Sequence, residues 1–247
     1  MKKIIKFNGS EMELKFENGF AVIELDGKYN FVKPNGELLS PKQWFDFISG
    51  FTEDGVALVG FGGGENLINK KGEFAFKGIT IKYIEMFDDQ TCHKVRSELG
   101  ITYIKPNGEF AFGDDVWFED GGRFRKSKKY VEVRKDGKWN FIDVDGNLLF
   151  KGWNFEHVDT FSHGLARVRL YGKENYVNEK GELLCNKLWF DEVEEHFFHE
   201  KYASVQLYGN KYLIDREGNL YVGNRYDEEP IERTQWPKEP IWPKELV

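Results

Sequence analysis

The sequence has few cysteines and no long apolar run. Its 247 residues include two cysteines, Cys92 and Cys185, which match no zinc-binding spacing. Two cysteines are also too few for the disulfide framework of a small secreted domain. No apolar run approaches the length of about 18 residues that a membrane-spanning helix needs. We therefore expect neither a disulfide scaffold nor membrane insertion.

The N-terminal segment lacks the features of a secretion signal. Residues 1–14, MKKIIKFNGSEMEL, contain two early lysines but no apolar core and no small-residue cleavage site. We accordingly expect a cytoplasmic protein. The formal net charge of −7 argues against nucleic acid as a general partner. The sequence leaves the oligomeric state open.

Helical patterns with recognisable caps are missing as well. The chain is rich instead in aromatic residues, with 22 Phe, 11 Tyr and 7 Trp, and it contains 26 glycines. Short apolar and aromatic runs alternate with glycine-containing turns along the whole sequence, and this pattern is typical of an all-β fold.

The glycines reveal six copies of a repeat of about 36 residues. The glycines that close the copies stand 35 to 38 residues apart, at Gly36, Gly72, Gly108, Gly146, Gly181 and Gly218. Nine residues earlier stand Gly27, Gly63, Leu99, Gly137, Gly172 and Gly209. Six residues earlier stand Asn30, Asn66, Thr102, Asn140, Asn175 and Tyr212. About twenty residues earlier stand Phe16, Phe51, Phe87, Phe124, Phe161, and Phe197 or Phe198. We number the repeats one to six by these closing glycines.

Repeat five shows the expected unit most clearly. Residues 165–170, LARVRL, alternate between apolar and polar side chains as a half-buried strand does. A turn at Tyr171 and Gly172 leads to a second strand from Asn175, and Gly181 closes a further turn. A single hairpin is marginal in water, so neighbouring copies must bury each other's apolar faces. The small residues Ala21, Ala57 and Ala166 are expected where copies approach closely.

The predicted fold is an all-β tandem array of six hairpin units in an open twisted or superhelical stack. A closed β-propeller is the alternative, although its blades need four strands each. Residues 1–15 are predicted to form an N-terminal hairpin cap, and residues 16–226 to form one domain of six repeats. The Pro- and Trp-rich tail, residues 227–247, is predicted to pack on the body through Trp236 and Trp242, which are six residues apart.

The repeat resembles the bacterial WG repeat, also called the KWG repeat. The resemblance lies in residues 137–146, which contain Gly-Lys-Trp, Phe-Ile-Asp and the closing glycine, and in residues 161–168, which contain Phe, Gly-Leu-Ala and Val. Four copies have asparagine in place of the glycine of the name. Because asparagine tolerates positive φ, we expect a bulge with left-handed backbone there. The resemblance implies an all-β repeat protein without catalytic residues.

No residue pattern indicates catalysis, a cofactor or a metal. The glycine-rich residues 60–66 have no phosphate-loop lysine after them, and residues 143–147 lack most ligands of a calcium loop. His196 and His199 are three residues apart, not the four of a helical zinc motif. We therefore expect a protein that is not an enzyme.

One cluster of charges is a candidate for binding a partner. Five cations stand within seven residues, in an acidic chain, at Arg123, Arg125, Lys126, Lys128 and Lys129. A solvated face is one interpretation, and a patch for an acidic partner is the other. The predicted function is a non-catalytic scaffold that binds another macromolecule, and the sequence favours a protein as that partner. An inhibitor or immunity protein against a bacterial toxin, or a carbohydrate or cell-surface binding module, is the alternative.

Overall fold

The computed structural model describes residues 1–7, 9–86, 90–113, 116–152, 154–185, 188–195, 201–222 and 232–233. The chain forms two compact parts, Met1–Trp117 and Phe118–Val247. The histidines at 196 and 199 and the tryptophans at 236 and 242 lie outside the described residues, so their predictions stay open. Among the described residues, no helix is long and apolar enough to cross a membrane.

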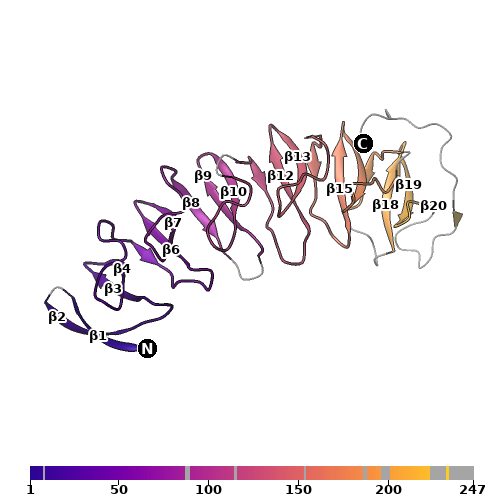
Figure 1. Cartoon of the computed structure of the whole chain (residues 1–247). Coiled ribbons are helices and arrows are strands. Elements are labelled where there is room, and N and C mark those ends of the chain that lie inside the picture. Colours follow the sequence, from indigo (N-terminus) through magenta and orange to yellow (C-terminus); the bar gives the residue numbers. More distant parts are fainter. Residues whose placement is uncertain are drawn as a thin grey trace. The chain divides into compact units, whose positions relative to one another are not determined.

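The described residues form β-strands, and helices are absent among them (Figure 1). The first part contains β1 (Lys2–Phe7), β2 (Ser10–Lys15), β3 (Ala21–Leu25), β4 (Lys28–Val32), β5 (Phe47–Ile48), β6 (Val56–Phe61), β7 (Gly64–Asn69), β8 (Ile81–Glu85), β9 (His93–Ser97) and β10 (Gly100–Ile104). The second part contains β11 (Asp120–Gly121), β12 (Tyr130–Lys135), β13 (Lys138–Asp143), β14 (His157–Val158), β15 (Leu165–Leu170), β16 (Lys173–Asn178), β17 (Glu192–Val193), β18 (Tyr202–Leu207), β19 (Asn210–Asp215), β20 (Leu220–Val222) and β21 (Glu232–Arg233).

A hairpin of two strands forms the body of every repeat, and all six hairpins share one register. The residue six before the closing glycine always pairs with a β-branched residue. The pairs are Ile23 with Asn30, Val59 with Asn66, Val95 with Thr102, Val133 with Asn140, Val168 with Asn175 and Val205 with Tyr212. The structure thus confirms the six-copy alignment. The N-terminal β1 and β2 pair as one further hairpin.

The closing glycines occupy equivalent turns. All six have φ between 80° and 89°, in the left-handed region that favours glycine. In each turn the glycine N–H donates to the carbonyl oxygen three residues earlier, at 2.9 to 3.1 Å. A side chain would be strained at this φ, which explains why glycine occupies this position in every copy.

The tip of most hairpins is a two-residue turn with positive φ at both positions. Examples are Asp136 at 51° with Gly137 at 73°, and Tyr171 at 49° with Gly172 at 71°. Turns of this kind match the twist of the strands they join. Repeat three differs, because there Gly100 has φ 116° and the preceding Leu99 does not have positive φ.

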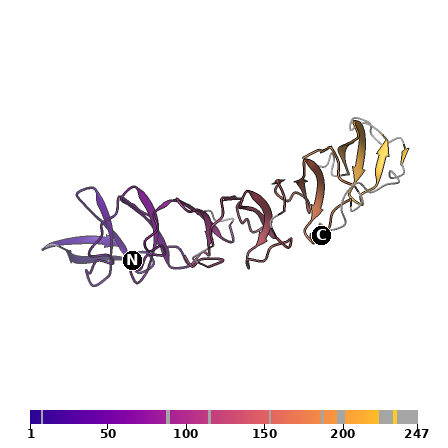
Figure 2. The same cartoon turned by 90° about the horizontal axis from the view of Figure 1, so that it is seen from above.

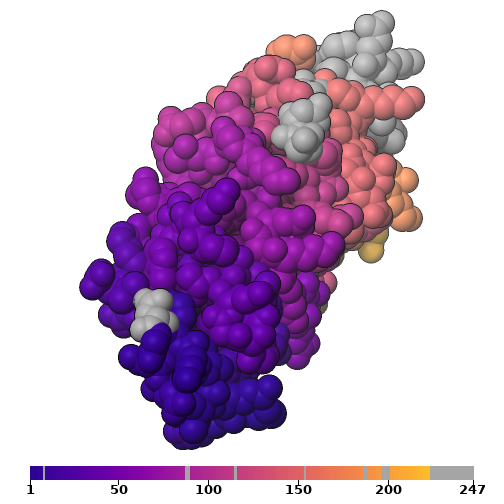
Figure 3. All heavy atoms as spheres, turned by 60° about the vertical axis from the view of Figure 1, so that its left-hand side comes forward, coloured from indigo at the N-terminus to yellow at the C-terminus, as the bar shows by residue number. Residues whose placement is uncertain are grey.

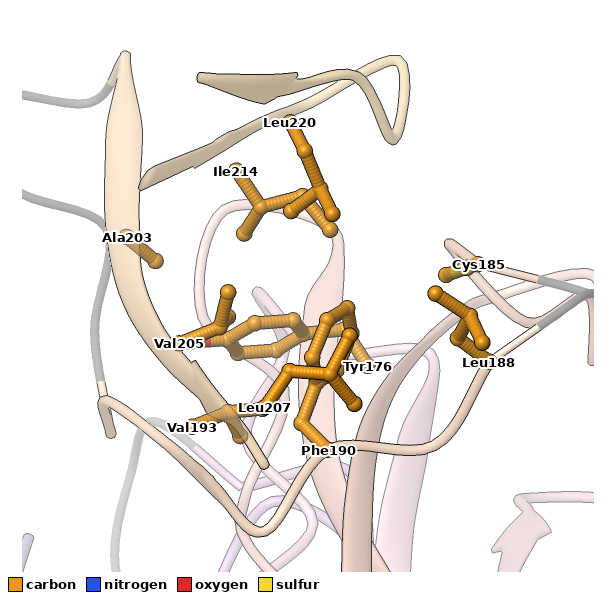
Figure 4. Close-up of a cluster of buried hydrophobic side chains, with 10 residues drawn as sticks. All are labelled: Tyr176, Cys185, Leu188, Phe190, Val193, Ala203, Val205, Leu207, Ile214 and Leu220. Carbon is orange, nitrogen blue, oxygen red and sulfur yellow. The ribbon is translucent and has the colours of Figure 1, made fainter. Parts of the chain in front are cut away.

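The hydrophobic core is divided into clusters that successive repeats share. One cluster joins Tyr176 and Phe190 of repeat five to Val205 and Leu207 of repeat six, and Figure 4 shows these side chains meeting. Other clusters join repeats four and five, one and two, and two and three, and a further one joins the N-terminal hairpin to repeat one. A single repeat therefore lacks a complete core.

The small residues lie where the prediction placed them. Ala21, Ala57 and Ala166 are buried, with exposed fractions of 3%, 0% and 2%. The described phenylalanines of the repeat register are buried too, namely Phe16, Phe51, Phe124 and Phe161. Heavy atoms of successive repeats lie against one another in the first part, coloured indigo to magenta (Figure 3).

Within each part the hairpins follow one another in chain order as an open stack (Figures 1 and 2). The six-stranded sheet of the first part has the strand order β10-β9-β8-β7-β6-β5, so each strand pairs with its neighbour in sequence. The described strands do not close into a barrel or a propeller. The open stack is therefore the correct prediction.

The expectation of positive φ at the asparagines is wrong. None of Asn30, Asn66, Asn140 and Asn175 is among the residues with positive φ. Each is buried, and its side-chain amide bonds to the backbone of the segment that follows the closing turn. Asparagine stands here because its side chain both donates and accepts, which glycine cannot do. In repeat three the hydroxyl of Thr102 donates to the carbonyl of Val116 at 2.8 Å.

Replacing Ala166 with phenylalanine tests the close approach of repeats four and five. Ala166 is buried in a cluster with Tyr130, Phe141 and Phe161, so a larger side chain would have to displace its neighbours. We expect Ala166→Phe to lower the free energy of unfolding by about 1–3 kcal/mol. Chemical denaturation measures this loss. The control variant is Leu148→Phe, at a site that is 37% exposed. A loss for Ala166→Phe of less than about 0.3 kcal/mol, similar to that of the control, would contradict close packing.

Tyr171 and Tyr208 occupy tip positions that suit other residues better. Their φ values are 49° and 50°, and bulky residues are disfavoured in this region. The equivalent residues are Asp26 and Asp136 in repeats one and four. We expect Tyr171→Asn to raise the free energy of unfolding by about 1 kcal/mol, because the strain is relieved. Chemical denaturation of this variant and of Tyr208→Asn checks the result, and a loss of stability in both would refute the strain.

Candidate binding surface on the second part

The hairpins of the second part have two ends with different character. One end holds the tips, with Tyr171 and Tyr208 exposed by 60% and 56%. The other end, which we call the turn edge, holds the turns that precede the first strand of each repeat and the closing turns. Its described segments are residues 123–129, 143–147, 160–165, 178–182 and 215–219. Strand pairing places them together, because Tyr130 pairs with Asp143 and Leu165 with Asn178.

The five cations predicted from the sequence lie in one loop of the turn edge. Four of them, Arg123, Arg125, Lys126 and Lys129, are exposed, and Lys128 is half-buried. The buried Phe124 anchors this basic loop, residues 123–129, in the protein. The N–H of Lys128 donates to the carbonyl of Arg125 at 2.9 Å and closes a turn. The structure therefore brings the five residues together on one exposed loop.

A cavity of about 530 Å³ adjoins the basic loop. Repeat four contributes Ser127 and Lys128 to its wall, and repeat five contributes the equivalent turn, residues 160–164, together with Glu179 from its closing turn. Two serines, a threonine, a lysine, a histidine and a glutamate therefore line one hollow between successive repeats. A comparable hollow of about 400 Å³ lies between the closing turns of repeats two and three in the first part.

Hydrogen bonds hold the walls of the cavity in place. The hydroxyl of Thr160 donates to a carboxylate oxygen of Glu132 at 2.9 Å, which links repeats five and four. Arg216 of repeat six donates to the carbonyl of His163 at 2.9 Å. His163 has φ 50° beside Gly164 at 81°, so the turn is a tight two-residue type. Three repeats therefore fix the shape of this region.

Aspartates in the closing turns bond to the backbone around them. The Oδ1 atom of Asp215 accepts from the N–H groups of Glu217 and Asn219, and its Oδ2 atom accepts from the hydroxyl of Tyr221. Burial of Asp215 favours the neutral acid, but these hydrogen bonds outweigh it and hold the pKa of the carboxyl below its usual value. Asp143 shows the same balance, with the same direction of pKa shift.

These two aspartates predict a loss of stability in acid. Their folded pKa lies below the unfolded value of about 3.9. Their contribution to the free energy of unfolding is thus fully present above that pH, and it disappears as the pH falls through the folded pKa. Repeat five has Asn178 at the equivalent position. We expect the double variant Asp143→Asn, Asp215→Asn to lose less stability between pH 5 and pH 3 than the parent, by denaturation at each pH. Parallel losses would show that other groups dominate.

A charge network lies inside the second part, between repeats five and six. The guanidinium of Arg167 bonds to Asp159 at 2.7 Å. The buried Glu174 binds Arg169 and accepts from the N–H of Val193 at 2.9 Å. Burial works against ionisation of Arg167, but Asp159 and Glu174 keep its pKa raised. Sequence reasoning missed this network because the sequence does not show that the hairpin register places Arg169 opposite Glu174 and that Glu174 is buried.

The two cysteines and the glycine-rich residues 60–66 lie in the core and in a hairpin of the repeats. Cys92 and Cys185 are buried and unbonded to each other, and burial raises the pKa of the Cys92 thiol, which opposes formation of a reactive thiolate. Residues 60–66 form the end of β6, a tip and the start of β7. Within the described part of the chain, no group of three or more His, Cys, Asp or Glu could hold a metal ion.

Comparison with known families agrees with this architecture. The sequence profile described as WG containing repeat matches residues 141–173. These 33 residues of the chain are thus similar to the WG containing repeat. The WG match begins in β13 of repeat four and ends at the start of β16 in repeat five. It therefore covers both the turn at residues 160–164 and Ala166. No curated protein sequence matches the chain.

Several solved structures show a distant likeness to this chain. One, described as KlHsv2 with loop 6CD replaced by a Gly-Ser linker, has 11% identity and a TM-score of 0.38, covering 69% of this chain and 63% of its own. The chain thus spans less than two thirds of that structure. BamB from Moraxella catarrhalis has 10% identity and a TM-score of 0.34, covering 83% and 72%. A protein of unknown function from Bacteroides caccae has 13% identity and a TM-score of 0.25, covering 78% and 87%.

Proposed function

We propose that the chain is a non-catalytic scaffold that binds an acidic protein through the turn edge of its second part. The observation that favours this role is the basic loop, residues 123–129, in a chain of net charge −7. Repeat arrays keep a constant core and vary their exposed loops, so a loop with unusual charge is a natural binding element. Complementary charge on the partner would speed association and reject basic competitors.

The fold suits binding better than chemistry. The carboxylate of Asp159 bonds to Arg167, and that of the buried Glu174 bonds to Arg169 and to the N–H of Val193, so both are occupied in holding the fold together. A backbone hydrogen bond from the N–H of Lys128 to the carbonyl of Arg125 closes a turn inside the basic loop. This bond restricts the loop before a partner binds, which reduces the conformational entropy lost on binding.

Charge reversal of the loop tests the proposal. The variant Arg123→Glu, Arg125→Glu, Lys126→Glu and the parent are each used to capture proteins from a lysate of the native cell. We expect an acidic protein that the parent retains and the variant loses. The control variant reverses three exposed lysines of the first part, Lys3, Lys42 and Lys71, with the same change in charge. Equal loss with both variants, or no loss with either, would reject the loop as the binding element.

The identity of a captured partner also separates the forms of this function. A toxin that loses activity when bound would make the chain an inhibitor or immunity protein. An acidic protein without such activity would leave it a general scaffold.

A further inference from the structure

We propose that the cavity between repeats four and five is a recognition pocket for an acidic peptide segment, with Lys128 as the residue that binds a carboxylate. This inference rests on the proposed function and assigns a pocket and a ligand chemistry to it. The cavity lies between two equivalent turns, residues 125–128 and 162–165, so it arises from the stacking of the repeats. Its volume of about 530 Å³ accommodates several peptide groups.

The lining groups match the polar groups of a peptide. The hydroxyl of Ser127 can donate to or accept from a peptide backbone. The hydroxyl of Thr160 donates to Glu132 and that of Ser162 bonds to the His163 ring, and both oxygens can still accept from backbone N–H groups. Glu179 on the opposite wall can accept from backbone N–H groups, and Lys128 can bind a carboxylate. A peptide that contains spaced acidic side chains presents both an anion and N–H donors. A polymer with an anionic group at every position would meet repulsion from Glu179.

Lys128 differs from the other cations of the basic loop. Lys128 is half-buried and lines the cavity. The other four, Arg123, Arg125, Lys126 and Lys129, are exposed. Partial exclusion of water strengthens a charge–charge interaction relative to one at a fully exposed site. The backbone of Lys128 is fixed by its hydrogen bond to Arg125. The adjacent Lys129 points elsewhere, with its ammonium 4.9 Å from the centre of the Tyr130 ring.

Neighbouring residues Lys128 and Lys129 make a matched pair for the test. The probe is a short fluorescein-labelled peptide of alternating glutamate and alanine, and binding to the full chain is followed by fluorescence anisotropy. We expect Lys128→Gln to weaken binding by about tenfold or more. Lys129→Gln removes the same charge outside the cavity and should weaken binding by less than about threefold. Ser162→Phe fills the cavity without a change in charge and should also weaken binding by about tenfold.

Each outcome decides a different point. Equal effects of Lys128→Gln and Lys129→Gln, or normal binding by a correctly folded Ser162→Phe variant, would overturn the pocket. If only the charge-reversed loop variant lost binding, the result would overturn the pocket and support the basic loop as the binding element. No binding of the peptide by the parent chain would overturn the pocket, and the capture experiment would then decide by itself whether the basic loop binds an acidic protein. Equal competition by an oligonucleotide of the same charge would show binding of polyanions in general and overturn the pocket. Circular dichroism and thermal melting confirm that each variant folds.

Discussion

The variant Asn175→Asp is expected to unfold the second part far more readily than the parent at neutral pH. Asn175 is fully buried, and its amide donates to the carbonyls of Cys185 at 2.7 Å and Leu188 at 2.9 Å. Its Oδ1 atom accepts from the N–H of Tyr176 at 2.8 Å. Aspartate keeps the acceptor but loses both donated bonds, and it places a carboxylate against two carbonyl oxygens. We expect a loss of about 3–5 kcal/mol in the free energy of unfolding.

The same chemical change three residues later is the control. Asn178 is in the same strand, and its Oδ1 atom accepts from the N–H groups of Lys180 and Glu182. Its amide donates to the carboxylate of Glu182 at an exposed site, where water can replace the lost bond and screen the added charge. Aspartate stands at the equivalent position in repeats four and six, at Asp143 and Asp215. Asn178→Asp should therefore cost less than about 1 kcal/mol. Urea denaturation of both variants measures the difference, and similar losses would contradict the specific role of the buried asparagine.

The variant Gly218→Ala is expected to cause the second largest loss in the free energy of unfolding, after Asn175→Asp. Gly218 has φ 81°, which disfavours any side chain, and a Cβ there would overlap the backbone carbonyl oxygen of Leu184 in the preceding repeat. The strain of φ alone costs about 1–2 kcal/mol. The overlap requires repeats five and six to move apart, so we expect a total loss of about 3 kcal/mol or more.

Gly209→Ala separates the two contributions to that loss. Gly209 lies in the same repeat with φ 78°, and a Cβ there would meet no atom within 4 Å. Its variant should show the cost of φ alone. The difference between the two alanine variants, measured by denaturation, gives the cost of disturbing the stack. Equal losses would show that repeats five and six are not in close contact at the closing turn.

The repeat register could be predicted from the sequence because backbone geometry restricts it. Positive φ at the closing turn requires glycine in every copy, and close approach of repeats requires the small Ala166. Both constraints make the same residue type recur at the same position of several copies, and this recurrence is visible in a single sequence. The basic loop was visible for a similar reason, since its cations are adjacent in the chain.

Features that depend on contacts between repeats could not be predicted in this way. The role of Asn175 was misread because asparagine suits both positive φ and buried hydrogen bonding, and the sequence does not show which applies. The turn at Tyr171 was predicted from Gly172, but the positive φ of Tyr171 and Tyr208 was not, because tyrosine usually avoids positive φ. The cavity joins Lys128 to Glu179, 51 residues later, through the stacking of two repeats.

Mapping the bound peptide on the protein tests the central claim most directly. Backbone amide chemical shifts of the isotopically labelled chain are recorded while the glutamate–alanine peptide is added. The turn edge should respond, with the largest shifts at residues 123–129 and 160–164 and at Glu179, and little change at the tips around Tyr171 and Tyr208. Shifts concentrated at those tips or in the first part, or shifts spread evenly over all exposed lysines, would contradict binding at the turn edge.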